Sequence, residues 1–130
     1  MSAHPLQAAC QDALDALVSQ TAGVGSAAVV TSDGFEVASV LHADLSVEKL
    51  AAMTSSLLAL SEAVASEMGM SRCRYVIVDT ESGAVVTLRV PTRGHDLLMC
   101  VLCGDGVSLG SVLYAARDSA RALARRLLLT

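Results

Sequence analysis

Aromatic side chains are almost absent from this sequence, which contains two Tyr, one Phe and no Trp. Basic residues are also few, because 9 Lys and Arg face 13 Asp and Glu and give a formal net charge of −4. Proteins that bind nucleic acids present basic surfaces, often with aromatic rings for stacking. We therefore expect no nucleic-acid partner.

Long hydrophobic runs are missing as well. Large apolar side chains never continue for the roughly 18 residues that a membrane span needs, and no basic leader precedes a cleavable apolar stretch. We therefore expect no membrane insertion and a cytoplasmic location. Residues 1–130 are enough for one domain with a single core.

The residue patterns of catalysis and metal binding are not found. No histidine has a Cys, Ser or carboxylate at the spacing of a nucleophilic dyad or a metal site; the three are His4, His42 and His95. Cys100 and Cys103 stand three apart in an apolar segment predicted to be a strand, so their sulfurs point to opposite faces and cannot chelate one ion. The segment 104–106 lacks the Gly-Lys-Ser/Thr continuation of a phosphate loop. We expect no enzymatic activity, no metal and no cofactor.

Apolar residues are abundant, at 53% of the chain, and they concentrate in a long predicted helix between Leu45 and Gly69. Ser46 is its expected N-cap and Gly69 its expected C-terminal stop. With about 100° per residue, one broad arc collects the large side chains Val47, Leu50, Met53, Leu57, Leu58, Leu60, Val64 and Met68. Small side chains form a separate line, which consists of Ala52, Ser56, Ala59, Ala63 and Ser66. Such a helix can rest on a sheet with one side and let a second helix approach closely on the other.

The remaining elements follow from spacing and turn residues. A first helix begins near Pro5 and ends at Gly23, an Asp33-Gly34 pair joins two strands as a hairpin, and Ser108 caps a last helix. The predicted strands cover residues 26–31, 35–41, 72–79, 84–90 and 96–103. The last strand is apolar on both faces, which is typical of a central strand between two helix layers. The order α-β-β-α-β-β-β-α therefore predicts a three-layer α+β domain, with the long helix on one face and the terminal helices on the other.

The strand at 72–79 carries apolar side chains on both faces, with Tyr75 and Ile77 on one and Val76 and Val78 on the other. An unpaired edge of this kind is an aggregation liability, which pairing with a second copy removes. The alternative is that the chain's own loops cover the edge and that the alanines of the long helix serve helix propensity.

Several segments in this order resemble the Roadblock family, small regulators related to dynein light chains and to bacterial partners of Ras-like GTPases. The likeness covers nearly the whole chain. Its segments are Thr-Ala-Gly-Val-Gly-Ser-Ala-Ala-Val-Val at 21–30, Asp-Gly-Phe-Glu-Val-Ala-Ser at 33–39, Glu-Met-Gly at 67–69, Tyr-Val-Ile-Val-Asp at 75–79 and Ser-Leu-Gly at 108–110. The match depends on their joint order and spacing, because each segment alone is common.

The resemblance implies a five-stranded, mostly antiparallel sheet in a profilin-like sandwich. It also implies a homodimer whose second helices pack antiparallel and whose third strands pair edge to edge, so that the shared surface contacts a small GTPase. The expected interface is the line of small residues together with Tyr75, Val76, Ile77 and Val78.

Arginine supplies nearly all the positive charge, and four arginines cluster in the last helix: Arg117, Arg121, Arg125 and Arg126. They are interpreted as a solvated face with cations near a helix C-terminus, and an acidic partner surface is the alternative. Arg93 lies in a predicted turn and is the one loop arginine to consider as a finger for a GTPase transition state. The resemblance implies no such finger, and a solvated turn is the preferred interpretation.

The leading functional hypothesis is a non-catalytic homodimer that regulates or scaffolds a small Ras-like GTPase through its paired second helices. One alternative is a structural adaptor in a multi-subunit assembly, without effect on nucleotide state. A second is a small-ligand sensor domain, against which the scarcity of aromatic and convergent polar residues counts.

Overall fold

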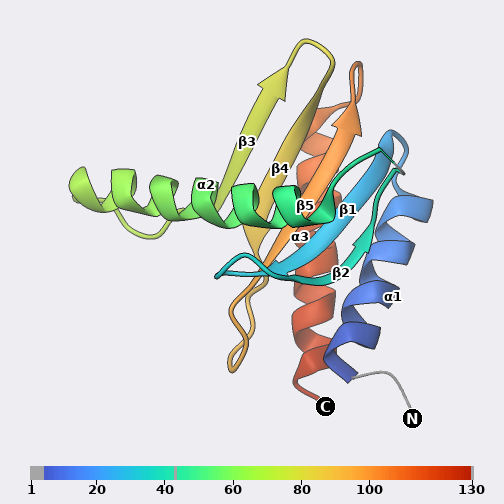
Figure 1. The fold of residues 1–130 in the computed structure, drawn as a ribbon, viewed down its shortest axis with the longest axis horizontal. Coiled ribbons are helices and arrows are strands. Elements are labelled where there is room, and N and C mark those ends of the chain that lie inside the picture. Colours follow the sequence, from blue (N-terminus) through green and yellow to red (C-terminus); the bar gives the residue numbers. More distant parts are fainter. Residues whose placement is uncertain (1–4, 43, 130) are drawn as a thin grey trace.

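The computed structural model describes residues 5–42 and 44–129. The elements are α1 (Pro5–Gln20), β1 (Val24–Thr31), β2 (Glu36–Val40), α2 (Val47–Glu67), β3 (Tyr75–Thr80), β4 (Gly83–Arg89), β5 (Leu97–Gly104) and α3 (Leu109–Leu127). The five strands form one sheet in the order β2-β1-β5-β4-β3, and every neighbouring pair is antiparallel (Figure 1). The predicted element order and the central position of the fifth strand are confirmed.

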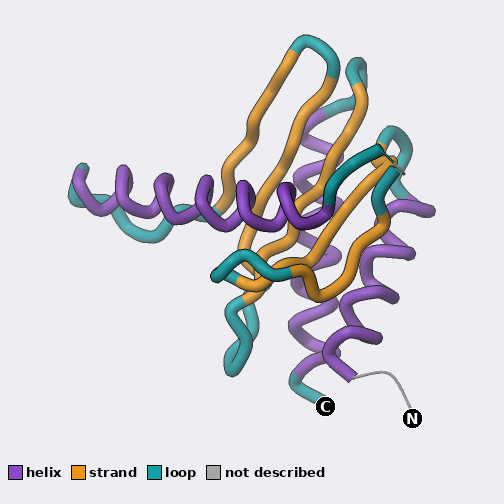
Figure 2. Tube along the Cα trace, viewed as in Figure 1, coloured by secondary structure: helices purple, strands orange, loops and turns teal. Residues whose placement is uncertain are grey.

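Helices cover both faces of the sheet. α1 and α3 lie together on one face, and α2 crosses the other face, with its C-terminal end extending past β3 in the view of Figure 2. The predicted three-layer arrangement is therefore confirmed. In the described part of the chain, no helix is long and apolar enough to cross a membrane.

The sheet separates two apolar clusters of very different size. Among the described residues, the cluster under α1 and α3 contains 22 buried residues, including Leu14, Met99 and Leu123. The cluster under α2 contains five: Ala28, Val30, Ala51, Leu58 and Leu98. Alternating side chains of β1 and β5 serve both clusters, so these strands are buried on both faces.

Local signals set the ends of the elements as predicted. The Ser46 hydroxyl accepts a hydrogen bond from the backbone N–H of Lys49 at 3.3 Å, and Ser108 caps α3 in the same way. α2 ends in a Schellman arrangement, in which the N–H of Met70 donates to the carbonyl of Ala65 and Gly69 takes the positive φ of +70°. The hairpin between β1 and β2 turns at Gly34, whose φ is +95°.

The third strand begins later than its sequence pattern predicts, at Tyr75 instead of residue 72. The backbone N–H of Cys73 donates to the Glu62 carboxylate of α2 at 2.8 Å, so this segment is bonded to the helix and not to a strand. The charged residues Arg72 and Arg74 are both exposed there.

Candidate protein-interaction surface

The contact of α2 with the sheet is narrow. Only Ala51, Thr54 and Leu58 of this helix are buried, and their spacing of three and four residues places them on one line. The small side chains Ala28 and Ala51 take part in the contact, which allows the helix and sheet to approach closely. Leu50 is partly buried against the same cluster, and the side of α2 opposite to this contact is exposed.

All five small residues predicted for the interface are exposed, on the side of α2 that faces away from the sheet: Ala52, Ser56, Ala59, Ala63 and Ser66. They are accessible in the monomer, and their role in an interface stays a prediction. Ala59 and Ala63 lie one turn apart in the C-terminal half of the helix, and these two alanines are the natural point of close approach for another helix.

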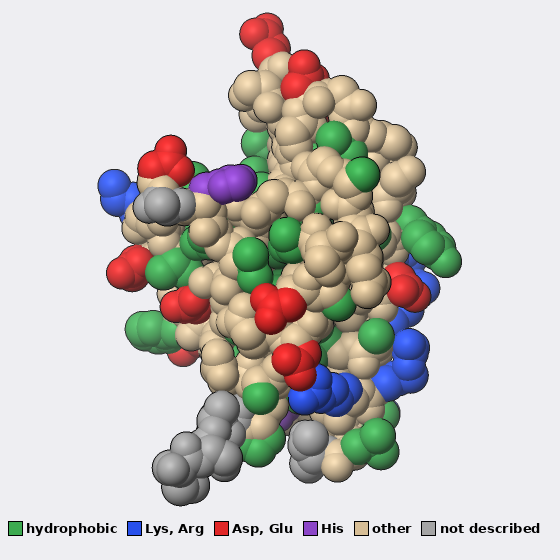
Figure 3. Space-filling view, turned by 90° about the vertical axis from the view of Figure 1, so that its right-hand side faces the viewer, with side chains coloured by type: hydrophobic (Ala, Val, Ile, Leu, Met, Phe, Trp, Pro, Cys, Tyr) green, Lys and Arg blue, Asp and Glu red, His purple; other side chains and the backbone are tan. Residues whose placement is uncertain are grey.

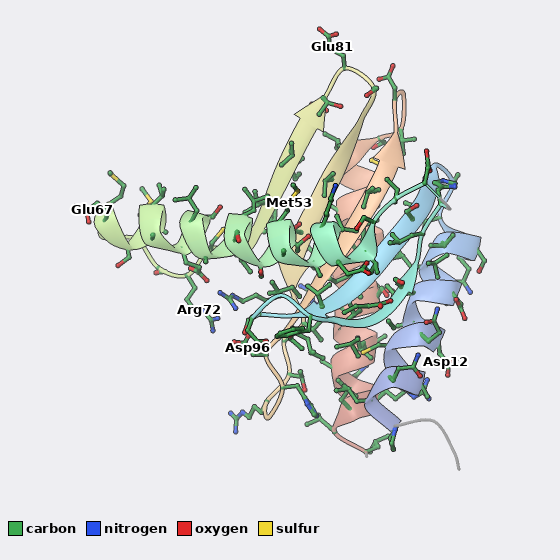
Figure 4. All side chains as sticks on the ribbon, viewed as in Figure 1. Asp12, Met53, Glu67, Arg72, Glu81 and Asp96 are labelled. Atoms are coloured by element: carbon green, nitrogen blue, oxygen red, sulfur yellow. The ribbon has the colours of Figure 1, made fainter. Side chains whose placement is uncertain are left out.

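The broad apolar arc of α2 does not rest on the sheet as a whole. Of its eight large side chains only Leu58 is buried, whereas Met53, Leu60 and Val64 are 68%, 64% and 55% exposed. Met68 is exposed as well, and Leu50 is partly buried against the cluster under α2. The arc therefore meets the sheet only along its edge with Leu50 and Leu58, and its other edge faces solvent. Figure 4 labels Met53 on the side of α2 and Glu67 near its far end.

β3 forms the edge of the sheet beside α2. It pairs with β4 on one side, and no strand in the described ranges pairs with its other side. The side chains of its predicted interface residues point to both faces of the sheet. Val76 packs against the cluster under α2, and Ile77 packs against the cluster under α1 and α3. Tyr75 and Val78 are exposed. The edge is therefore free to pair, while Val76 and Ile77 already have partners inside the monomer.

An ion-pair cluster fixes α2 to the sheet beside this edge. The Glu62 carboxylate accepts hydrogen bonds from the Cys73 backbone N–H at 2.8 Å and from the Arg89 guanidinium at 2.7 and 3.1 Å. These hydrogen bonds, first that of Cys73 and then those of Arg89, hold the pKa of Glu62 below its ordinary value. The cluster joins α2, the segment before β3 and the end of β4, so it sets the position of the helix relative to the edge strand.

We call the exposed side of α2 together with the free edge of β3 the α2–β3 surface. Its large apolar members are Met53, Leu60, Val64, Met68, Met70, Tyr75 and Val78. The sequence prediction selected the small residues and missed the large ones of α2, although the broad arc on the helical projection was the signal that could have found them. Large exposed apolar patches mark interaction sites, and the exposed apolar side chains along α2 make this helix the candidate for one.

The structure describes two of the three histidines and both of the cysteines that were considered for chemistry. His42 and His95 are exposed, and His4 lies outside the described residues. Cys100 packs on the α2 side of β5 and Cys103 belongs to the cluster on the other side, as the strand period predicts. Within residues 5–42 and 44–129, no group of three His, Cys, Asp or Glu is placed to hold a metal ion.

Burial makes two of the thiols poor nucleophiles. It raises the pKa of Cys10 to about 11, and it also raises the pKa of Cys100. A protonated, buried thiol is neither a good nucleophile nor a metal ligand. Cys73 is the least buried of the four.

A three-layer α+β domain with an open sheet edge and an uncovered helix is the build of a protein-interaction module. The model of the Roadblock/LC7 domain matches residues 10–103, and the chain belongs to this family. Comparison with curated proteins finds no match.

Solved structures agree with this fold. A Roadblock/LC7 domain from Streptomyces avermitilis superposes with a TM-score of 0.80 at 22% identity, over 92% of this chain and 98% of that chain. The gliding protein MglB from Thermus thermophilus gives a TM-score of 0.80 at 19% identity, over 100% and 96%. Profilin IA from Acanthamoeba castellanii gives 0.62 at 16% identity, over 89% and 97%. These likenesses establish the profilin-like fold.

Proposed function

We propose that residues 1–130 act as one non-catalytic Roadblock module that forms a homodimer through the α2–β3 surface and regulates or scaffolds a small Ras-like GTPase in the cytoplasm. The observation that carries the proposal is the exposed apolar arc of α2 beside the free edge of β3. Family membership supports the GTPase as the class of partner.

A second copy of this chain fits the α2–β3 surface in two ways at once. An antiparallel β3–β3 pairing satisfies the free backbone groups of both edges and extends the sheet. Two α2 helices then meet on the same side of that sheet, and the small side chains of Ala59 and Ala63 allow their axes to come close. The large residues Met53, Leu60 and Val64 flank this contact and lose their exposure to water, which supplies the apolar burial that a stable dimer requires.

The GTPase is proposed to contact the outer side of the paired helices. A regulator changes nucleotide turnover when it binds one conformation of the switch segments better than another. The arrangement of this chain favours such a binding role over a direct chemical one, because Arg93 is an exposed turn residue outside the α2–β3 surface.

The dimer is tested by the double substitution Ala59→Glu and Ala63→Glu. It places four carboxylates at the proposed helix–helix contact, so light scattering is expected to change from twice 13.4 kDa to 13.4 kDa. Far-UV circular dichroism is expected to remain that of the folded chain, because both positions are exposed in the monomer. The matched control is Tyr114→Glu on α3, which is 73% exposed on the other face and is expected to leave the dimer intact. An unchanged dimer in the double variant would place the interface elsewhere.

The partner is tested by mixing the purified dimer with small GTPases encoded near its gene, each loaded with GDP or with a non-hydrolysable GTP analogue. Nucleotide-dependent binding with altered turnover supports regulation, and nucleotide-independent binding without altered turnover supports the adaptor role. Absence of binding to every such GTPase contradicts the proposed partner but leaves the dimer standing.

A further inference from the structure

A second feature of the molecule lies at the end of the sheet where β4 ends and β3 and β5 begin. A cavity of about 440 Å³ opens there between the sheet and α3. Six of the eight arginines of the chain line it: Arg72, Arg74, Arg89, Arg93, Arg117 and Arg121. Asp96 is the only carboxylate that the described residues contribute to the lining. Figure 4 labels Arg72 and Asp96 below α2, at this end of the sheet.

Most of these arginines have no anionic partner. Arg89 is paired, at 2.7 Å with Glu62 and at 3.4 Å with Asp96, and Arg72 lies 3.7 Å from Glu62. Across residues 5–42 and 44–129, nothing forms an ion pair or hydrogen bond with the guanidinium groups of Arg74, Arg93, Arg117 and Arg121. In a chain of net charge −4, four free cations around one cavity are a local excess that repels itself.

The helix dipole does not explain this excess. It favours cations in the last turn of α3, which holds Arg125 and Arg126. Arg117 and Arg121 lie two and one turns earlier and face the cavity. Arg126 instead pairs with Asp12 of α1 at 2.7 Å. Figure 3 shows the face of the molecule that lies on the right in Figure 1. Most of the basic side chains on this face gather in its lower right part, while the acidic ones are scattered.

The chemistry of the lining selects its ligand. Among the described residues, the lining contains six arginines and no lysine. The planar guanidinium group of arginine binds oxyanions in a bidentate manner. The volume falls in the range of small-molecule pockets, and the floor includes the buried apolar residues Leu88, Val90 and Ala120, which strengthen electrostatic attraction. A terminal phosphoryl group carries about 1.5 to 2 negative charges in a compact volume, more than a carboxylate of similar size.

We propose that this arginine-lined cavity binds a soluble oligophosphate, an anion with two or more linked phosphoryl groups. The free guanidinium groups on α3, on the turn before β5 and on the segment before β3 converge on such an anion from three sides. The imidazole of His95 is the only aromatic ring that the described residues contribute to the lining, so the phosphate chain and not a stacked base is the recognised part. The proposal does not depend on the α2–β3 surface.

The test is isothermal titration calorimetry, in which the full chain is titrated with inorganic tripolyphosphate. The wild type is expected to bind one equivalent per chain, with an affinity that falls as salt is raised. The double variant Arg117→Ala/Arg121→Ala is expected to bind at least about 10-fold more weakly, because two charge-assisted contacts are lost. Arg93→Ala, in a turn where it cannot disturb a helix, is expected to weaken binding as well.

The matched control is Arg125→Ala, on the same helix but outside the cavity, which is expected to change the affinity less than about 2-fold. Equal weakening by Arg125→Ala, or no saturable binding by the wild type, overturns the proposal. Co-sedimentation with phosphatidylglycerol vesicles and titration with a polyglutamate peptide separate other anions. If either binds through Arg117 and Arg121 while tripolyphosphate does not, the ligand class is wrong.

Discussion

The two faces of the sheet differ in how completely this chain covers them. On one face α1, α3 and the sheet share a cluster of 22 buried residues of the described chain, and on the other α2 and the sheet share a cluster of five. The first face is buried as extensively as the core of a stable domain. The second has a thin apolar layer, an ion-pair cluster at Glu62 and a helix whose large side chains point outward.

This difference in coverage is what the proposed dimer through the α2–β3 surface requires. A helix that buried its whole apolar arc on the sheet would stabilise the monomer more, but it would leave nothing for a partner to cover. α2 contributes only Ala51, Thr54 and Leu58 to the interior, so the monomer is stabilised mainly by the α1 and α3 face. The α2 face is then free to serve as an interface.

The largest expected contrast is in core stability. Leu14→Ala, on the buried side of α1, is expected to lower the free energy of unfolding by about 3–5 kcal/mol, because a closely packed site cannot collapse around the cavity. Leu58→Ala, on the buried side of α2, is expected to lower it by about 2–3 kcal/mol, because the helix has solvent behind it and can shift inward. Denaturant unfolding measures both in the Ala59→Glu/Ala63→Glu background. Equal losses would mean that the two faces are packed alike.

The second-largest effect is expected in the rates at which the cysteine thiols react with a reagent. Cys73 is expected to react first with a thiol reagent, because the other three cysteines are buried. Cys100, on the β5 face that α2 covers, should then react faster than Cys10, on the buried side of α1, because a helix with few buried contacts opens more often. Both are protected in the closed state by burial and a raised pKa. Mass spectrometry of labelled peptides follows the order, with full labelling in guanidinium as the control. Equal or faster labelling of Cys10 contradicts the contrast.

The smallest effect is expected for the Glu62 carboxylate, whose hydrogen bonds attach α2 to the sheet beside the small apolar cluster. A carboxyl whose pKa is lowered by folding stabilises the folded state above its unfolded pKa, near 4.5, and this contribution is lost as the pH falls through its folded pKa. Glu62→Gln is therefore expected to lower the melting temperature slightly at pH 7. The difference from wild type should shrink as the pH falls below 4.5. Glu67→Gln, at the exposed end of α2, is the control that should show no such trend. A difference that persists at low pH would assign the effect to packing.

Much of the fold could be predicted because its signals are local. Ser46 and Ser108 cap helices through residues three positions away, and the Asp33-Gly34 pair turns the hairpin. The apolar run of β5 identified the central strand. The start of β3 was missed because the bond between Cys73 and Glu62 joins residues 11 positions apart, which no local pattern shows.

The candidate sites were predictable only in part. The small residues of α2 are exposed, but the rotation of the helix that exposes Met53, Leu60 and Val64 was not foreseen. It depends on how the α2 residues Ala51 and Leu58 pack with residues of β1 and β5, which lie far away in the sequence. The arginine-lined cavity was not foreseen either, because its members come from four separate segments.

The sequence by itself determined the elements, their order, the two-sided burial of the central strand and the excess of apolar surface on one helix. These follow from residue periodicity and from caps, which act over a few neighbouring positions. Only the tertiary structure decided which side of α2 meets the sheet and which arginines share one cavity. Both depend on the packing of residues far apart in the chain, where the shape of one element selects the rotation of another.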